Sequence, residues 1–386
     1  MPFKTPNPDA LEEAVMERIE DLRHRLRYAI LGEPRRWTGR IRQHALARAI
    51  RGSNTIEGYD VSKNDALAAA EGEEPLEANE AAWTAVTSYR NAMTYVLQLA
   101  DSPTFEHSEM LISSLHYMML QYDLDKSPGR YRTGPIYVYD DELHENVYEG
   151  PEAEAVPALM KEFVETLQMS DAPVMVRAAM AHLNLVMIHP FRDGNGRMAR
   201  GLQTLVLARE GIIAPQFSSI EEYLGRYSRD YYSILAEVGG GKWQPERDAR
   251  PWVRFCLTAH FRQATTVLRR AKEAEKLWEL LDAEVRRERL PERMVLALFD
   301  AALGYATRNA TYRKAAELSS QVASRDLLTL CDAGLLEPHG EKRGRYYLAT
   351  DRTRTLRKKA QEARPPLEDP FETTSPRQLK LVLPDQ

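Results

Sequence analysis

Apolar side chains recur every three or four residues along most of this chain, which is the spacing of amphipathic helices. Alternating apolar and polar positions are confined to Ile136–Tyr139 and Asn146–Tyr148, which predict a small hairpin across an acidic loop. The predicted fold class is therefore mainly all-α. Helices are expected over residues 9–31, 79–100, 111–120, 152–169, 172–188, 224–238 and 252–288.

The pattern changes after Pro291, where short predicted helices at 294–299, 311–317 and 320–333 precede a two-stranded segment ending in Lys342–Leu348. Residues 291–361 hold thirteen Lys/Arg against eight Asp/Glu, although the whole chain has a formal net charge of -5. We expect an N-terminal helical region, a central core, a helical linker, a basic module and a Pro-rich, disordered tail. Their expected ranges are 1–100, 101–240, 241–290, 291–361 and 362–386.

Composition bounds the class of protein. The 386 residues, 43% of them hydrophobic, are enough for two or three domains with real cores. Neither the net charge nor the first ten residues indicate a membrane protein or a signal peptide, and no apolar run approaches the ~20 residues of a membrane span. The two cysteines, Cys256 and Cys331, lie in apolar helical patterns and fit a reducing compartment. We expect a cytoplasmic protein without a membrane partner.

The run His189-Pro-Phe-Arg-Asp-Gly-Asn-Gly-Arg-Met-Ala-Arg200 gathers groups that suit phosphate chemistry. The helix before it is expected to end near Ile188, because the residue preceding Pro190 is disfavoured in the α region. The next helix is expected to begin near Asn195. Gly194 and Gly196 lack a Cβ, so backbone N–H groups at that helix start can approach an anion.

Four side chains of the run add to this anion site. Asp193 is a hard oxygen ligand suited to Mg²⁺. Arg197 and Arg200 present planar guanidiniums that match phosphate oxygens. His189 titrates near neutral pH and can accept a hydroxyl proton. Separately, each feature fits a plain turn, a solvated helix face or a buried histidine, but their combination in one run favours the anion site.

The run resembles the signature of the Fic family, His-x-Phe-x-Asp-Gly-Asn-Gly-Arg-x-x-Arg, at every specified position. Most members transfer AMP from ATP to a Ser, Thr or Tyr hydroxyl of a protein. The degenerate relative Doc phosphorylates, but its motif departs at glycine and arginine positions that this chain keeps. The resemblance implies His189 as general base, Asp193 as Mg²⁺ ligand, Gly194, Asn195, Gly196 and Arg197 around the phosphates, and Arg200 on the γ-phosphate.

A second motif, Ser53-Asn-Thr-Ile-Glu57-Gly58, lies at a predicted helix C-terminus. Gly58 is a natural residue just past a helix end, whereas Glu57 meets an unfavourable helix dipole that a distant cation would offset. The motif resembles the inhibitory pattern of class II Fic proteins. That resemblance implies that Glu57 pairs with Arg200 and occupies the γ-phosphate position; a plain capped helix end is the alternative.

The predicted hairpin resembles the Fic flap, which docks the target segment by strand addition. Ile136, Tyr137 and Val138 would then hold the target, and the alternative is an edge hairpin that only covers the core.

Tyr231 lies where the family often places an aromatic side chain beside adenine. A buried structural pair of Tyr231 and Tyr232 is an equal alternative.

Residues 291–361 resemble the winged helix-turn-helix that is often appended to bacterial Fic proteins. Their positive charge, against a negative whole, suggests DNA as a partner, although winged helices also bind proteins. The expected DNA contacts are Ser320, Gln321, Ser324 and Arg325 on the recognition helix and Lys342 and Arg343 in the wing.

Two functions follow as hypotheses. The first is a self-inhibited protein adenylyltransferase that uses ATP and Mg²⁺ and modifies a protein hydroxyl, in a partner or in itself; use of another nucleotide and removal of AMP are variants. The second is a DNA-binding regulator whose nucleotide site senses without catalysing. The family resemblance also implies a homodimer as a possible assembly.

Overall fold

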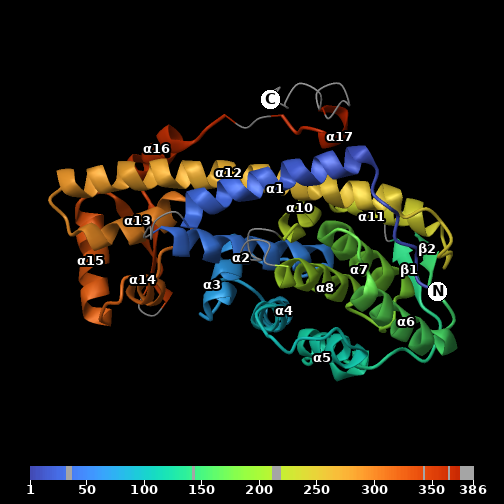
Figure 1. Cartoon of the computed structure of the whole chain (residues 1–386). Helices are drawn as coiled ribbons and strands as arrows, with labels where there is room; N and C mark the ends of the chain where they lie inside the picture. Colours follow the sequence, from blue (N-terminus) through green and yellow to red (C-terminus); the bar gives the residue numbers. More distant parts are fainter. Residues whose placement is uncertain (32–36, 141–143, 211–218, 342–343, 364–365, 374–386) are drawn as a thin grey trace, which may run out of the picture.

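The computed structural model describes the chain except residues 32–36, 141–143, 211–218, 342–343, 364–365 and 374–386. Helices dominate, and the mainly-α prediction is confirmed (Figure 1). No helix among these described residues is long and apolar enough to cross a membrane. The helices are α1 (Ala10–Leu31), α2 (Thr38–Ile56), α3 (Lys63–Glu71), α4 (Glu80–Ala100), α5 (Glu109–Leu120), α6 (Val156–Met169), α7 (Val174–Ile188), α8 (Asn195–Arg209), α10 (Glu221–Arg226), α11 (Ser228–Gly239), α12 (Arg250–Arg287), α13 (Val295–Ala302), α14 (Asn309–Ala315), α15 (Ser320–Asp332), α16 (Asp351–Ala360) and α17 (Pro370–Thr373).

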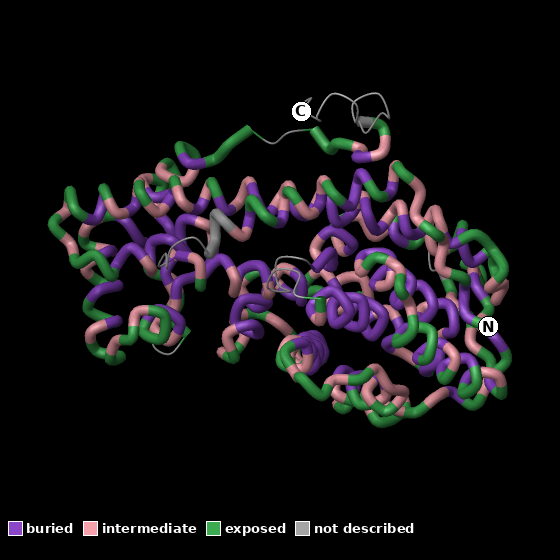
Figure 2. Tube along the Cα trace, viewed as in Figure 1, coloured by how far each residue is buried: buried purple, intermediate pink, exposed green. Residues whose placement is uncertain are grey.

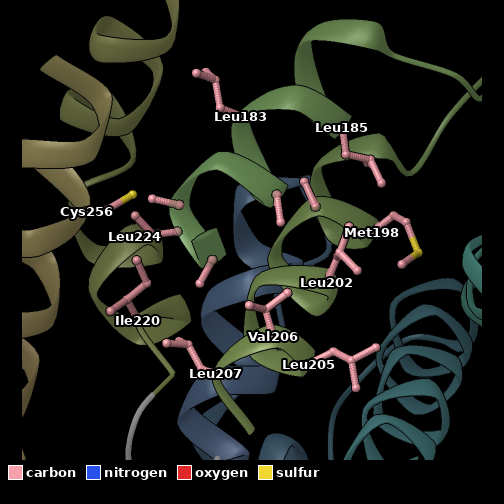
Figure 3. Close-up of a cluster of buried hydrophobic side chains, with 14 of the residues drawn as sticks. Leu183, Leu185, Met198, Leu202, Leu205, Val206, Leu207, Ile220, Leu224 and Cys256 are labelled. Atoms are coloured by element: carbon pink, nitrogen blue, oxygen red, sulfur yellow. The ribbon is translucent and has the colours of Figure 1, made fainter. Parts of the chain in front are cut away.

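The strands form two antiparallel hairpins, β1 (Tyr137–Asp140) with β2 (Glu145–Glu149) and β3 (Leu336–His339) with β4 (Tyr346–Ala349). The larger core surrounds the antiparallel pair α7 and α8, whose facing side chains are drawn in Figure 3. Met198, Leu202 and Leu205 of α8 are completely buried there. Figure 2 shows the burial concentrated in these central helices.

Helix α12 extends along the molecule and contributes to both hydrophobic cores. Its 38 residues extend for about 57 Å, with α1 packed alongside (Figure 1). Trp252 and Cys256 at one end belong to the larger core, whereas Leu277 and Leu281 at the other belong to a second core with the C-terminal unit. The stretch 241–290, expected as a linker, is therefore packed along most of its helical length.

The C-terminal unit consists of α13, α14, α15, the β3–β4 hairpin and α16. Ala323 and Leu327 of α15 are completely buried in its core, and Cys331 is only half-buried. The unit also packs against α2, where Arg40 and His44 both contact Asp300 of α13. The helix that carries Glu57 is therefore attached to this unit.

Two predictions are corrected. The helix expected over 224–238 is two helices that meet at Tyr227, because Gly225 lies directly on Gly52 and fixes α10 across α2. Part of the tail expected to be disordered from Glu362 packs on the body instead, while residues 364–365 and 374–386 of that tail lie outside the described residues. Phe371 of α17 lies against the larger core with Arg254 stacked over its ring at 5.3 Å, so an apolar anchor within the polar tail was missed.

Candidate functional site

The loop between α7 and α8 is held in one shape by its own side chains. Helix α7 ends at Ile188, as predicted, and His189 takes a left-handed conformation with φ +50°. The Asn195 amide bonds the Phe191 backbone in both directions, accepting from its N–H and donating to its carbonyl, each at 2.9 Å. Phe191 is fully buried and stacks on His116 at 3.7 Å. The Asn195 side chain is thus committed to the loop, and only its backbone N–H remains to face a phosphate.

His189 is oriented as a proton acceptor. Its Nδ1 lies 2.9 Å from the Val186 carbonyl, so Nδ1 carries the hydrogen and Nε2 keeps a free lone pair. Burial, with Arg132 nearby, lowers the pKa of His189 despite the Val186 bond, which keeps the imidazole neutral at pH 7. These are the properties that a general base requires.

Arg132 clamps the strand-rich segment to the His189 loop. Its guanidinium donates to three carbonyls, those of His189 at 2.8 Å, Gly134 at 2.8 Å and Pro151 at 2.5 Å. Its backbone N–H donates to the Pro190 carbonyl at 2.9 Å. Sequence patterns do not reveal these contacts, because Arg132 lies 57 residues from His189 and 19 residues from Pro151.

The start of α8 has the backbone geometry that the predicted anion site requires. Gly194 is the N-cap with φ +73°, and a Cβ there would run into Leu120, so glycine is required. The first N–H groups of α8 have no partner within the helix, and its positive dipole end faces the same loop.

Asp193 is already paired with a cation of the protein. Its Oδ2 lies 2.5 Å from the Lys126 Nζ, and its Oδ1 accepts from the Gly194 N–H at 2.7 Å. Burial opposes the charge, but Lys126 and that N–H outweigh it and hold the pKa of Asp193 below its usual range. His116 donates to the Asp193 carbonyl at 2.8 Å. Neither Lys126 nor His116 was predicted, since both precede the motif by more than 60 residues.

Arg197 is buried with spare hydrogen-bonding capacity. Its guanidinium stacks over the Tyr59 ring at 5.1 Å, and one nitrogen donates to the Tyr122 hydroxyl at 3.3 Å. Its Nε and second terminal nitrogen have no partner among the described residues. A buried guanidinium with unused donors is costly unless an anion completes it.

Arg200 and Glu57 are in contact. One Arg200 nitrogen donates to Glu57 Oε1 at 2.7 Å and to the Ser53 carbonyl at 3.0 Å, and Nε donates to the Ser53 hydroxyl at 2.7 Å. Burial opposes the charge of Arg200, but Glu57 outweighs it and raises the pKa of Arg200 above its usual range. The other terminal nitrogen of Arg200 has no partner among the described residues.

The Glu57 carboxylate lies over the start of α8. Helix α2 ends at Ile56, and Gly58 follows with φ +80°, as the sequence predicts. A Cβ on Gly196 would overlap the Glu57 carboxylate and lie 3.0 Å from Arg200. The three residues 53, 57 and 58 are therefore brought to the end of the site where Arg200 lies.

The β1–β2 hairpin borders His189. Tyr148 of β2 donates to the Met187 carbonyl at 2.8 Å, and a Cβ added to Gly150 would lie 3.8 Å from the Cβ of His189. The far edge of β2 is bridged by Lys242, whereas the outer edge of β1 has no strand beside it in the described part of the chain. The three flap residues Ile136, Tyr137 and Val138 follow this edge, with Tyr137 48% exposed.

Tyr231 and Tyr232 differ in burial and in their hydrogen-bond partners. Tyr231 is 1% exposed and its hydroxyl pairs with His182 Nε2 at 3.0 Å, which fits the buried structural alternative. Tyr232 is 48% exposed and donates to the Ile56 carbonyl at 3.1 Å, beside Glu57.

The proposed DNA contacts Ser320, Gln321, Ser324 and Arg325 are exposed on α15 of the C-terminal unit, and Lys342 and Arg343 lie outside the described residues.

Part of this chain is similar to proteins of a known family. Residues 106–207 match the model of the Fic/DOC family, a stretch that contains the whole 189–200 run but not Glu57. The protein adenylyltransferase Fic of Nematostella vectensis is 28% identical over 264 residues, 65% of this chain and 55% of that protein. The protein adenylyltransferase fic-1 of Caenorhabditis elegans is 32% identical over 157 residues, 39% of this chain and 27% of that protein. The chain thus spans about half the length of the first relative and less of the second.

Solved structures agree on the fold. A Fic family protein from Desulfovibrio desulfuricans has a TM-score of 0.58 at 22% identity and covers 90% of this chain and 98% of its own. A Fic domain containing signaling protein from Bacteroides thetaiotaomicron has a TM-score of 0.55 at 22% identity, over 66% of this chain and 98% of its own. At these identities, the likeness concerns the fold alone.

Proposed function

We propose, from the premise that this chain contains a domain of the Fic/DOC family, that it is a protein adenylyltransferase held inactive by Glu57. One observation carries the proposal most directly. His189, with only its Nε2 lone pair free, stands in a loop that leads into buried arginines with unpartnered nitrogens. A base beside a phosphate-binding cradle is what nucleotidyl transfer to a hydroxyl requires.

In the proposed reaction, a Ser, Thr or Tyr hydroxyl of a target protein, or of this chain itself, attacks the α-phosphorus of ATP. The bond from the hydroxyl oxygen to phosphorus forms as the bond from the α-phosphorus to the bridging oxygen breaks, and pyrophosphate leaves. The hydroxyl proton passes to His189 Nε2. Arg197 and the N–H groups at the start of α8 stabilise the phosphate oxygens in place of water.

Asp193 fits a Mg²⁺ ion carried with the phosphates. It is ionised, it lies beside the α8 N-terminus, and the Lys126 ammonium already shows that a cation is accommodated against its Oδ2. The metal would be held by Asp193 and phosphate oxygens, and when bound it would supply charge neutralisation to the leaving pyrophosphate.

The unpaired edge of β1 supports target docking at the flap. An extended target segment added there would pair with the strand whose neighbour, β2, leads into Gly150 beside His189. Backbone pairing places the segment without a sequence requirement, while Ile136 and Val138 offer half-buried apolar surface to its side chains.

The Glu57–Arg200 contact supports class II autoinhibition. A γ-phosphate oxygen and the Glu57 carboxylate compete for the same guanidinium, and Glu57 is already in place without an ordering cost. The unpartnered nitrogen of Arg200 shows that the guanidinium has capacity for a further anion oxygen.

The test is Mg²⁺-dependent incorporation of α-labelled ATP into protein by the full chain, alone and with lysate. Glu57→Gly is expected to label strongly, wild type weakly, and Glu57→Gly with His189→Ala not at all. Glu77→Gly, which removes an exposed glutamate away from Arg200, is the matched control and should behave as wild type. Equal labelling of wild type and Glu57→Gly would remove the switch, and no label in any form would favour another transferred group or a nucleotide sensor.

A second candidate function is DNA binding by residues 291–361. Three helices followed by the β3–β4 hairpin have the order of a winged helix-turn-helix, and Gln321 and Arg325 near the start of α15 are exposed. A gel shift of the full chain at low salt should weaken on Arg325→Ala but not on Arg286→Ala, an exposed arginine of α12. Absence of a shift would favour a protein-docking module.

A further inference from the structure

A cavity distant from the His189 loop is lined by an excess of positive charge. It has a volume of about 630 Å³ and lies between α2, α12, the end of α10 and the segment that follows α16. Seven arginine or lysine side chains line it, against three glutamates. Its size is that of a small-molecule site, and none of the residues 189–200 contributes to it.

Around Glu222 the positive charges outnumber the carboxylates that contact them. Arg270 makes two hydrogen bonds to this carboxylate, both at 2.7 Å, while Arg48 lies 3.3 Å and Arg226 3.2 Å from it. One carboxylate therefore faces three guanidiniums. Burial opposes its charge, but Arg270 and then Arg48 lower the pKa of Glu222 to about 2. The Nε of Arg48 has no hydrogen-bond partner within the described chain.

Lys63 adds a further cation to the lining of the cavity. Its ammonium lies 5.5 Å from the Tyr305 ring, and no carboxylate is paired with it among the described residues. Partial burial, together with Arg357 and Arg51, lowers the pKa of Lys63, as expected where like charges gather without an anion. Folding these cations together is unfavourable unless an anion joins them.

Aromatic side chains lie beside the cations. Tyr227, Phe261 and Tyr305 line the same space, and Tyr305 is fixed by stacking on His44 at 4.3 Å. Guanidinium groups beside aromatic rings suit a ligand that carries both phosphate and a planar ring.

We propose that this cavity binds a phosphate-bearing small molecule of nucleotide size, with Arg48, Lys63 and Arg270 on the phosphate. The site is separate from the proposed transferase site and does not depend on that activity. Its walls come from α2, which carries Glu57, and from α12, which spans both cores, so an occupant contacts elements of both parts of the molecule (Figure 1).

Isothermal titration of the full chain with pyrophosphate and, separately, with ADP tests the site. One pyrophosphate per chain is expected at the cavity, with affinity that falls as salt is raised, and Arg197→Ala removes any second binding event at the proposed transferase site. In the Arg197→Ala chain, Lys63→Ala and Arg48→Ala should each weaken the remaining binding about tenfold, the worth of one charge-assisted contact. Lys272→Ala, on an exposed α12 position outside the lining, should leave it unchanged.

Several outcomes separate the possibilities. Tighter binding of ADP than of pyrophosphate supports the aromatic wall, and equal binding supports a phosphate site without base recognition. Loss of binding on Arg197→Ala, with no effect of Lys63→Ala, would place the ligand at the His189 loop and overturn the proposal. Absence of saturable binding of either probe at millimolar concentration would also overturn it. Thermal unfolding of Lys63→Ala and Arg48→Ala, each compared with Lys272→Ala, shows whether a weakened variant is still folded.

Discussion

Arg40 of α2 and Asp300 of α13 form a buried ion pair of two hydrogen bonds, 3.0 Å from Nε to Oδ1 and 2.5 Å between the other two atoms. The side chains are 8% and 6% exposed. The 19 residues of α2 make the helix about 28 Å long, with Arg40 near its start and Glu57 directly after its end. The start of α2 is therefore anchored in the C-terminal unit. Glu57, directly after the end of the same helix, contacts Arg200.

Asp300→Ala is the first prediction, because it leaves Arg40 and His44 without their shared carboxylate. Arg40 keeps its buried ion pair with Glu71, so we expect a loss of about 1–3 kcal/mol of unfolding free energy. With its anchor lost, α2 should also hold Glu57 less firmly, so labelling from ATP should rise above wild type. Denaturant unfolding and the labelling assay measure the two effects.

Arg293→Ala is the matched control for Asp300→Ala. It breaks the Arg293–Asp326 pair inside the same unit, which does not touch α2. A rise in labelling in this variant as well would mean that general loosening of the unit, and not the α2 anchor, releases Glu57.

Gly52→Ala tests the crossing of α2 and α10. A Cβ at Gly52 would collide with the Glu221 backbone, and Gly225 packs against the same point, so the two helices must separate. We expect a loss of about 1–3 kcal/mol in unfolding free energy. Gly39→Ala, on the same helix with nothing within 4 Å, should be neutral or slightly stabilising. Similar stability of the two variants would show that the crossing tolerates a methyl group.

The pH dependence of Glu57→Gly follows from His189. The base must be neutral, and burial lowers the pKa of His189 below its usual 6.5, so the rate should be level from pH 7 to 8. It should fall below pH 6.5 as the imidazole becomes protonated and loses its Nε2 lone pair. Measuring kcat/KM from pH 5 to 8 checks this, and a rate still rising above pH 7.5 would point to a base other than a neutral His189.

The sequence predicts the local features of this protein well. The end of α7, the start of α8 and the Gly58 conformation all depend on residues within a few positions of one another. The Glu57–Arg200 contact was expected from the family resemblance and is present in the structure across 143 residues.

What the sequence did not predict depends on single long-range partners. His116 and Lys126 have no periodic pattern that marks them, and their roles arise only when α5 and the following turn fold against the Asp193 loop. The Arg40–Asp300 pair joins segments 260 residues apart. The docking of Phe371 likewise depends on one apolar side chain. The polar composition of the residues around it led to the prediction of a disordered tail.

Lys126→Met tests how Asp193 accommodates a metal. In the structure, Lys126 Nζ occupies the Oδ2 side of Asp193 at 2.5 Å, so Mg²⁺ must share or displace that cation. Removing the ammonium abolishes this competition, and the carboxylate then gains more from a divalent ion. Titration of Mg²⁺ into the Glu57→Gly chain with a nonhydrolysable ATP analogue, followed calorimetrically, should show tighter Mg²⁺ binding in Lys126→Met. Arg192→Met, which removes an exposed cation of the same loop bonded to the Asp125 carbonyl, is the control and should leave Mg²⁺ binding unchanged. Weaker Mg²⁺ binding in Lys126→Met would instead show that Lys126 assists the bound phosphates.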